Sequence, residues 1–240
     1  MKLSFATVTA LLLALLVTPQ LQAREADAMR RIVVTGEGSA AVAPDMAVLN
    51  LSVMREAATA REALSANSEA MTNVVAAMKR FAIEDRDLQT SGFNIQPRYV
   101  YSPKNTGGQS RKLTGYTVRN SLTVRVRDID RVGEVLDTSV TLGVNEGGSV
   151  TFTNADPSEV IREARIAAVK AARDKAQTLA QAADVKLGPL QEMSEQSHTP
   201  GPMPVMRAEM SMAARDGAVP VAQGENTYNV QVHLTFAIDD

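Results

Sequence analysis

The sequence predicts an α+β fold in which antiparallel strand hairpins carry three helices packed on the sheet, in the order ββαββαβαββ. Stretches in which apolar residues fall at every second position come in pairs separated by turn-forming residues, which is typical of antiparallel hairpins. Three other segments place apolar residues every three or four positions, which is typical of amphipathic helices. The chain contains no cysteine, so a packed core must stabilise it without disulfides.

The first hairpin is predicted between Arg31 and Met54, with Pro44-Asp45 as its turn. Its second strand has a polar face and an apolar face, the latter formed by Ala47, Leu49, Leu51 and Val53. From Glu56 to Phe81 the period changes to that of a helix. The apolar stripe of this helix contains Ala60, Leu64, Met71, Val74, Met78 and Phe81.

A second, longer hairpin is predicted over residues 88–127. The stretches "FNIQPRYVY" and "LTGYTVRNSLTVRV" alternate as strands do, and "SPKNTGGQSRK" between them supplies turn-forming residues. Pro97 indicates an edge strand or a bulge. Because both strands are long and carry tyrosines on exposed faces, we expect the hairpin to project beyond the body of the fold and to offer a contact surface.

The next two helices have recognisable ends. Asp128 is a candidate N-cap for a short helix that stops at Gly143, and "GSVTFTN" after it is a short strand. The clearest helix of the chain begins with Asp156 as N-cap and Pro157 in the first turn, and Glu159 is placed to complete a capping box. Its many alanines favour close approach to a sheet or another helix.

Residues 196–224 break every periodic pattern, lying between strands predicted over residues 186–194 and 226–239. They contain four prolines and three glycines among scattered polar residues, which predicts a long mobile loop. We divide the rest into two α+β lobes, 31–105 and 106–240, with the boundary near the loop at 102–112. The long hairpin provides the alternative, in which both lobes form one unit.

The first 23 residues predict export. A lysine precedes an apolar run from Ala10 to Val17, and Ala23 ends a short polar stretch, which is the order of a secretory signal peptide. The run is shorter than the roughly 20 residues that span a bilayer, although an uncleaved anchor is the alternative. Residues 24–30 are then a linker, no later stretch is apolar enough to span, and the predicted location is the periplasm.

The charge balance argues against nucleic acid as a partner. The formal net charge is −2, and removal of Lys2 with the signal peptide makes it more negative. A nucleic-acid-binding chain needs a basic footprint, which this composition does not provide.

One motif resembles a dinucleotide-binding turn, because Gly36, Gly38 and Ala41 have the spacing G-x-G-x-x-A after an apolar run. That turn needs a helix immediately after the glycines to hold the pyrophosphate. Here "AVAPDMAVLNLSV" reads as a strand, and Pro44 blocks a helix. The glycines therefore predict a bulge or a close backbone approach, and we predict no cofactor.

Other residue types with catalytic potential are scattered. His198 lies in the predicted loop and His233 on the polar face of the last strand, without the spacing of a metal site. Three acidic residues cluster in a turn, where solvated side chains are favoured over paired catalytic carboxylates, and three arginines read as the solvated side of a strand. These are Glu84, Asp85 and Asp87, and Arg119, Arg125 and Arg127. No catalytic residue is predicted.

Four methionines are crowded into the proline-rich loop, namely Met203, Met206, Met210 and Met212. Thioether sulfur is a soft ligand that suits copper(I), which exported proteins encounter. The alternative is a flexible, oxidisable segment or one that packs on a partner subunit. These methionines are the only metal-ligand candidates of the sequence.

Four blocks of the chain resemble, in order, the successive blocks of the SIMPL-domain family: "VTGEGSAAVAPDMAVLNLSV", "DLQTSGFNIQPRY", "GYTVRNSLTVRVRDIDRVGEVLD" and "ARDKAQTLAQAADVKLGPL". Within it, the chain is similar to the periplasmic immunogenic (outer-membrane-protein-28-like) proteins of Gram-negative bacteria. The resemblance covers nearly all of the mature chain. It implies an exported α+β protein without established enzymatic activity, linked to oxidative-stress protection and host antibody responses, with ring- or channel-like homo-oligomers in some members. It transfers no functional residue, because the family has no agreed site.

Three functions remain to be compared. The first is a non-catalytic periplasmic protein that acts through homo-oligomeric assembly in stress tolerance. The second is a ligand-binding module, in its sharpest form for copper(I). The third is an enzyme, for which the sequence offers no triad, metal set or phosphate loop. A homo-oligomer is the partner we predict, and peripheral association with the cell envelope stays open.

Overall fold

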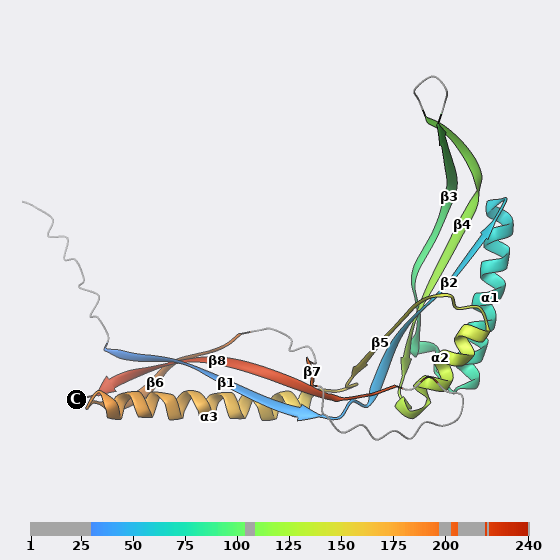
Figure 1. Ribbon diagram of the computed structural model, residues 1–240. Helices are drawn as coiled ribbons and strands as arrows, with labels where there is room; N and C mark the ends of the chain where they lie inside the picture. Colours follow the sequence, from blue (N-terminus) through green and yellow to red (C-terminus); the bar gives the residue numbers. More distant parts are fainter. Residues whose placement is uncertain (1–29, 104–108, 197–202, 206–218, 220, 240) are drawn as a thin grey trace, which may run out of the picture.

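The computed structural model describes residues 30–103, 109–196, 203–205, 219 and 221–239, which form two antiparallel sheets with helices packed on them (Figure 1). The terminal sheet contains β1 (Arg31–Val42), β8 (Glu225–Asp239) and β6 (Lys186–Glu195) in that order, and the short β7 (Met203–Val205) also pairs with β8. The hairpin sheet contains β3 (Leu88–Pro103), β4 (Gln109–Val126), β2 (Met46–Ala57) and β5 (Glu146–Thr153) in that order. The helices are α1 (Ala60–Arg80), α2 (Val132–Thr141) and α3 (Ser158–Ala182). The α+β class and the predicted order are confirmed, with β7 added.

Helix α3 lies along the terminal sheet and contacts it through alanines four residues apart. The buried stripe consists of Ala164, Ala168, Ala172, Ala176 and Ala180. Since alanine ends at Cβ, the helix approaches β1 and β8 closely and buries their apolar face. This face contains Val34, Val230, Val232, Leu234 and Phe236.

The hairpin sheet has a core of larger side chains. Met71, Val74 and Met78 of α1 pack on the face formed by Leu49, Leu51 and Val53 of β2 and Leu122, Val124 and Val126 of β4, together with Val132 and Val135 of α2. The predicted stripe is thus confirmed at Met71, Val74 and Met78, and Phe81 packs against them, whereas Ala60 and Leu64 are only partly buried.

The starts of the helices differ from the sequence expectations. Strand β2 continues to Ala57, and α1 begins only at Ala60 because Thr59 and Glu62 form a capping box. Helix α3 begins at Ser158 with Pro157 at the cap position, and Asp156 accepts a hydrogen bond from the Ser158 backbone N at 3.0 Å.

Two expected caps are not made. Glu159 pairs with Arg162 and does not complete a capping box. Asp128 makes no side-chain cap bond, and a 3-10 turn over Ile129–Arg131 precedes α2. Local acceptors and ion pairs compete with the caps that spacing alone suggests.

The pairing of the strands shows which segments of the chain share a sheet. Strand β1 pairs with β8, and β2 pairs with β4 and β5, so the first hairpin predicted between Arg31 and Met54 is wrong and the first strand joins the C-terminal elements. Strands β3 and β4 pair with each other as predicted, within one sheet. The division into lobes 31–105 and 106–240 stays a prediction. The predicted signal peptide, the 24–29 part of the linker and most of the 196–224 segment lie outside the described residues.

Asn154, at the passage from β5 to α3, joins the two sheets. Its amide nitrogen donates to the carbonyl oxygen of Ala43 at 2.8 Å, and its amide oxygen accepts from Asn226 at 2.9 Å and from the Tyr228 hydroxyl at 3.0 Å. Burial raises the pKa of Tyr228, so this hydroxyl keeps its proton and remains a donor.

Candidate functional site

The β3–β4 hairpin extends past the end of α1, as expected from the length of its strands (Figure 1). At the base of the hairpin, α1 covers one face of β4 and buries Val118 and Leu122. Directly opposed residues share a face in an antiparallel pair, so the same face can be followed outward along β3 and β4, where no described helix covers it. We call its exposed part the hairpin apolar face. It contains Phe93 (55% exposed), Ile95 (41%), Tyr99 (36%), Tyr101 (57%) and Leu113 (44%).

Local irregularities shape the hairpin without changing this face. The register between β3 and β4 shifts between Thr90 and Gly92 and again between Arg98 and Tyr99. Pro97 lies in β3, which is the outer strand of the sheet, so the predicted edge position is confirmed.

The opposite face of the hairpin is mostly polar, with Val100 as an exposed apolar residue, and carries ion pairs. Arg98 pairs with Glu56, and Arg119 donates two hydrogen bonds to Glu146, one of them at 3.0 Å. Hydrogen bonding from Arg119 lowers the pKa of Glu146. Both pairs lie near the base, where β2 and β5 supply the carboxylates.

A charge asymmetry along the hairpin was missed by the sequence reasoning, although composition counted by segment reveals it. Residues 88–127 include no acidic residue in a chain whose formal net charge is −2. The basic residues there are Arg98, Lys104, Arg111, Lys112, Arg119, Arg125 and Arg127. The hairpin therefore combines exposed apolar surface with positive charge.

The glycines of the G-x-G-x-x-A motif are explained by the terminal sheet. A Cβ on Gly36 would lie 2.1 Å from the carbonyl oxygen of Ala168, and one on Gly38 would lie 2.1 Å from that of Ala164. No side chain fits there. The predicted close backbone approach is confirmed, and the strand that follows the glycines matches the expectation.

The turn carboxylates do not behave as one group. Glu84 and Asp85 are exposed and pair with Arg86 and Lys79, as expected of solvated residues. Asp87 is only 4% exposed and accepts two hydrogen bonds from Arg127, both at 2.9 Å, so the expectation of solvation is wrong for Asp87, whereas Arg127 is exposed as expected. Hydrogen bonding from Arg127 lowers the pKa of Asp87.

The remaining arginine and histidine candidates lie apart. Arg125 is exposed on the polar side of β4. His233 lies on the side of β8 away from α3, and its Nδ1 is 2.9 Å from the Thr35 hydroxyl, whereas His198 lies outside the described residues. Among the described residues, no three His, Cys, Asp or Glu side chains are grouped to hold a metal ion.

Of the four methionines that are copper candidates, the structure describes Met203. The backbone of Met203 belongs to β7 and pairs with Thr227, whereas Met206, Met210 and Met212 lie outside the described residues. The copper(I) hypothesis therefore rests on the sequence alone.

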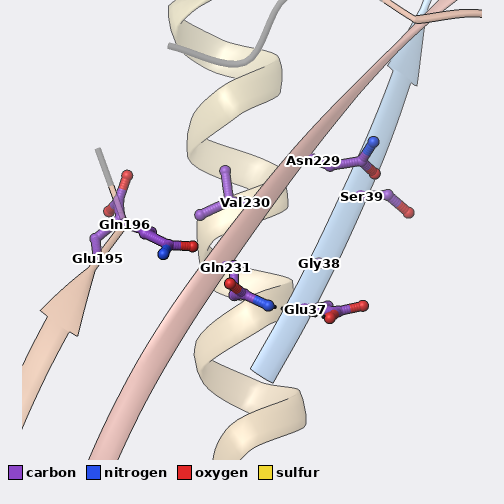
Figure 2. Close-up of a pocket in the computed structure, with 8 residues that line it drawn as sticks. All are labelled: Glu37, Gly38, Ser39, Glu195, Gln196, Asn229, Val230 and Gln231. Carbon is purple, nitrogen blue, oxygen red and sulfur yellow. Dashed lines mark hydrogen bonds between the residues drawn. The ribbon is translucent and has the colours of Figure 1, made fainter. Parts of the chain in front are cut away.

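A cavity of about 400 Å³ opens on the terminal sheet beside the end of β6 (Figure 2). Figure 2 shows Gln231 beside Glu37, to which it donates a hydrogen bond of 3.1 Å, with Ser39 and Asn229 farther along the strands. The Glu195 carboxylate is held by Arg165. The described lining residues offer polar contacts, of which Gln231 and Glu37 bond each other, and they present no nucleophile with a base beside it.

Comparisons with known proteins place the chain. Residues 32–236 match SIMPL, described as a protein of unknown function (DUF541). The chain belongs to the SIMPL family. The predicted family is therefore confirmed.

Relatives extend this result. The chain is 56% identical over 211 residues to the 26 kDa periplasmic immunogenic protein of Brucella melitensis, covering 87% of this chain and 84% of the relative, and equally similar to its namesake in Brucella abortus. It is 28% identical over 219 residues to the uncharacterized protein YggE of Escherichia coli K12, covering 91% of this chain and 87% of that relative.

The comparisons confirm the location. The chain is a periplasmic protein and a homologue of periplasmic immunogenic proteins. Among the helices of the described part, none is both long and apolar enough to cross a membrane.

Proposed function

We propose that this chain is a non-catalytic periplasmic protein that acts through homo-oligomeric assembly in tolerance of oxidative and envelope stress. The observation that carries the proposal is the hairpin apolar face, which continues a core face beyond the helix that covers its base. Soluble monomers rarely expose large contiguous apolar patches, and such patches mark interaction sites.

The charges on the hairpin favour a second copy as the occupant of this face. Arg98, Lys112 and Arg119 lie on the opposite face, and Arg111 stacks on Tyr99 with its guanidinium carbon 3.6 Å from the ring centre. Two hairpin apolar faces can therefore meet without opposing rows of like charge. Most soluble oligomers are symmetric homo-oligomers, which use such self-complementary contacts.

The test is the mass of the mature chain in solution, measured by size-exclusion chromatography with light scattering over a dilution series. We expect a discrete species larger than the monomer, and a shift to monomer in the double variant Phe93→Ser/Ile95→Ser. The control is Ile166→Ser, which removes an apolar residue of α3 that is 58% exposed and lies far from the hairpin in the sequence. A wild-type chain that stays monomeric at every concentration would refute the proposal.

The stress role is tested in cells. A strain lacking the protein should survive peroxide less well, and the wild-type chain should restore survival while the Phe93→Ser/Ile95→Ser variant should not. Equal rescue by the wild-type chain and the variant would show that stress tolerance does not depend on assembly. The similarity to immunogenic relatives supports a further part of the proposal, that antibodies from an exposed host bind the purified chain.

A second candidate function is copper(I) binding, favoured by the methionine cluster of the loop before β8. Titration of the mature chain with copper(I) should show binding that a variant lacking residues 203–212 has lost. Equal binding by both chains would exclude the loop as the ligand.

A further inference from the structure

The distal end of the hairpin differs from the rest of it, because both of its faces carry an apolar residue beside a basic one. Val100 is paired with Lys112, and the next pair, Tyr101 with Arg111, points to the other side of the ribbon. Val100 is 52% and Tyr101 57% exposed. We call these four residues the hairpin tip.

The positive charge of the hairpin tip is uncompensated in the described part of the chain. Nearer the base, Glu56, Glu146 and Asp87 pair with Arg98, Arg119 and Arg127. Arg111 instead lies over the Tyr99 ring, and no described carboxylate forms an ion pair with Arg111 or Lys112. The basic groups therefore lie at the end of the hairpin that projects farthest from the body (Figure 1).

This arrangement fits a surface that surrounds the hairpin tip better than a partner that covers one side. A protein covering the hairpin apolar face would leave Val100 and Lys112 on the outside. In the headgroup region of a bilayer, however, lipid contacts both faces, tyrosine is favoured at this depth, and basic side chains meet phosphate groups.

We propose that the hairpin tip docks peripherally on a bilayer surface containing anionic phospholipid. This inference goes beyond the proposed function; it shares Tyr101 with the hairpin apolar face but does not use Phe93 or Ile95, at which the assembly variant is placed. Tyr101 and Val100 enter the headgroup region, and Arg111 and Lys112 bind lipid phosphates. Charge complementarity selects the lipid, since the segment carries basic residues and no acidic ones.

The experiment is cosedimentation of the full mature chain with phosphatidylcholine vesicles, with and without 30% phosphatidylglycerol. We expect binding only to the anionic vesicles, weakened by added salt. Arg111→Glu/Lys112→Glu should lower the partition coefficient at least about 25-fold, since each basic residue near an anionic surface contributes about fivefold. Val100→Ser/Tyr101→Ser should also lower it.

A charge-matched control separates docking at the hairpin tip from a general charge effect. Arg61→Glu/Arg173→Glu makes the same change in net charge on exposed positions of α1 and α3 and should retain most of the binding. Equal losses in the two charge variants, or equal binding to both kinds of vesicle, would overturn the inference.

The assembly proposal is scored separately on the same samples by light scattering before vesicles are added. An assembled wild-type chain that ignores anionic vesicles would refute docking alone, and a monomeric chain that binds them would refute assembly alone. If the hairpin-tip variants abolish assembly instead of lipid binding, the hairpin tip belongs to the contact between copies and the inference fails.

Discussion

The terminal sheet and the hairpin sheet each have an apolar face, but a helix buries this face in the terminal sheet and leaves part of it exposed in the hairpin sheet. Helix α3 has 25 residues, so it spans about 38 Å, close to the roughly 40 Å of the 12-residue β1 beneath it. Helix α1 has 21 residues and spans about 32 Å, whereas the 18-residue β4 spans about 60 Å. Because α3 and β1 have similar lengths, the helix covers the apolar face of the terminal sheet. Because α1 is much shorter than β4, part of the apolar face of the hairpin sheet stays uncovered.

The difference shows how to separate residues that stabilise the fold from residues that offer contacts. Along the terminal sheet, alternation of apolar residues on β8 ends in full burial, with Leu234 and Val232 almost inaccessible. On β3 the same alternation ends in exposure at Phe93 and Ile95. Substitutions in the two regions should therefore have very different effects on the free energy of unfolding.

The largest effect is expected from filling the contact between β1 and α3. Gly36→Val places side-chain atoms where the Ala168 carbonyl oxygen and Ala172 already lie, so we expect a loss of about 3 kcal/mol or more in the free energy of unfolding. Urea denaturation followed by circular dichroism measures it. Gly92→Ala in the hairpin is the control, since its Cβ would lie 3.6 Å from Ser121, and it should cost less than about 1 kcal/mol. Similar costs at both glycines would contradict the close-packed description of the terminal sheet.

The next effect concerns the buried ion pair at the base of the hairpin. Asp87→Ala removes both hydrogen bonds to Arg127, and because that guanidinium is half exposed we expect a loss of about 2 kcal/mol rather than the cost of a fully buried pair. Asp85→Ala, in the same turn but exposed, should change the free energy of unfolding by less than about 0.5 kcal/mol. Equal effects at Asp85 and Asp87 would refute the distinction between them.

The same pair predicts a pH dependence. The pKa of Asp87 is lower in the folded chain than in the unfolded chain, so its contribution to stability is fully present above the unfolded value near 3.8 and is lost as the pH falls through the lower folded value. The stability difference between wild type and Asp87→Asn should therefore shrink below about pH 4. Denaturation curves at pH 6, 4 and 3 measure it, and a constant difference would contradict the role of the ionised carboxylate.

The smallest effect is expected at the hairpin apolar face. Ile95→Ser should change the free energy of unfolding of the dilute monomer by less than about 0.5 kcal/mol, because the side chain is exposed and covers no core. Leu234→Ala in the terminal sheet, only 1% exposed, should cost about 2 to 5 kcal/mol. A large cost of Ile95→Ser in the monomer would mean that the face stabilises the fold of a single copy.

Sequence reasoning succeeded where one local pattern dominates. The capped and alternating segments located the strands and helices, and Pro97 correctly indicated an edge. Reasoning failed where a partner from a distant segment decides the outcome. Asp87 looked solvated because Arg127, which pairs with its carboxylate, is 40 residues away in the chain. The start of α1 was missed although Thr59 and Glu62 have the spacing of a capping box, whereas the start of α3 moved because Asp156 bonds to the Ser158 backbone.

The sequence by itself determined the α+β class, the order of the elements, the family, and the periplasmic location. These depend on periodicity, turn residues and blocks that resemble a known family, which are local properties of the chain. Only the tertiary structure decided that β1 pairs with β8, that Gly36 and Gly38 serve the alanine stripe of α3, and which part of the hairpin α1 leaves uncovered. Sheet pairing and burial depend on contacts between segments far apart in sequence, and the periodicity of a strand is the same whether or not a helix covers it.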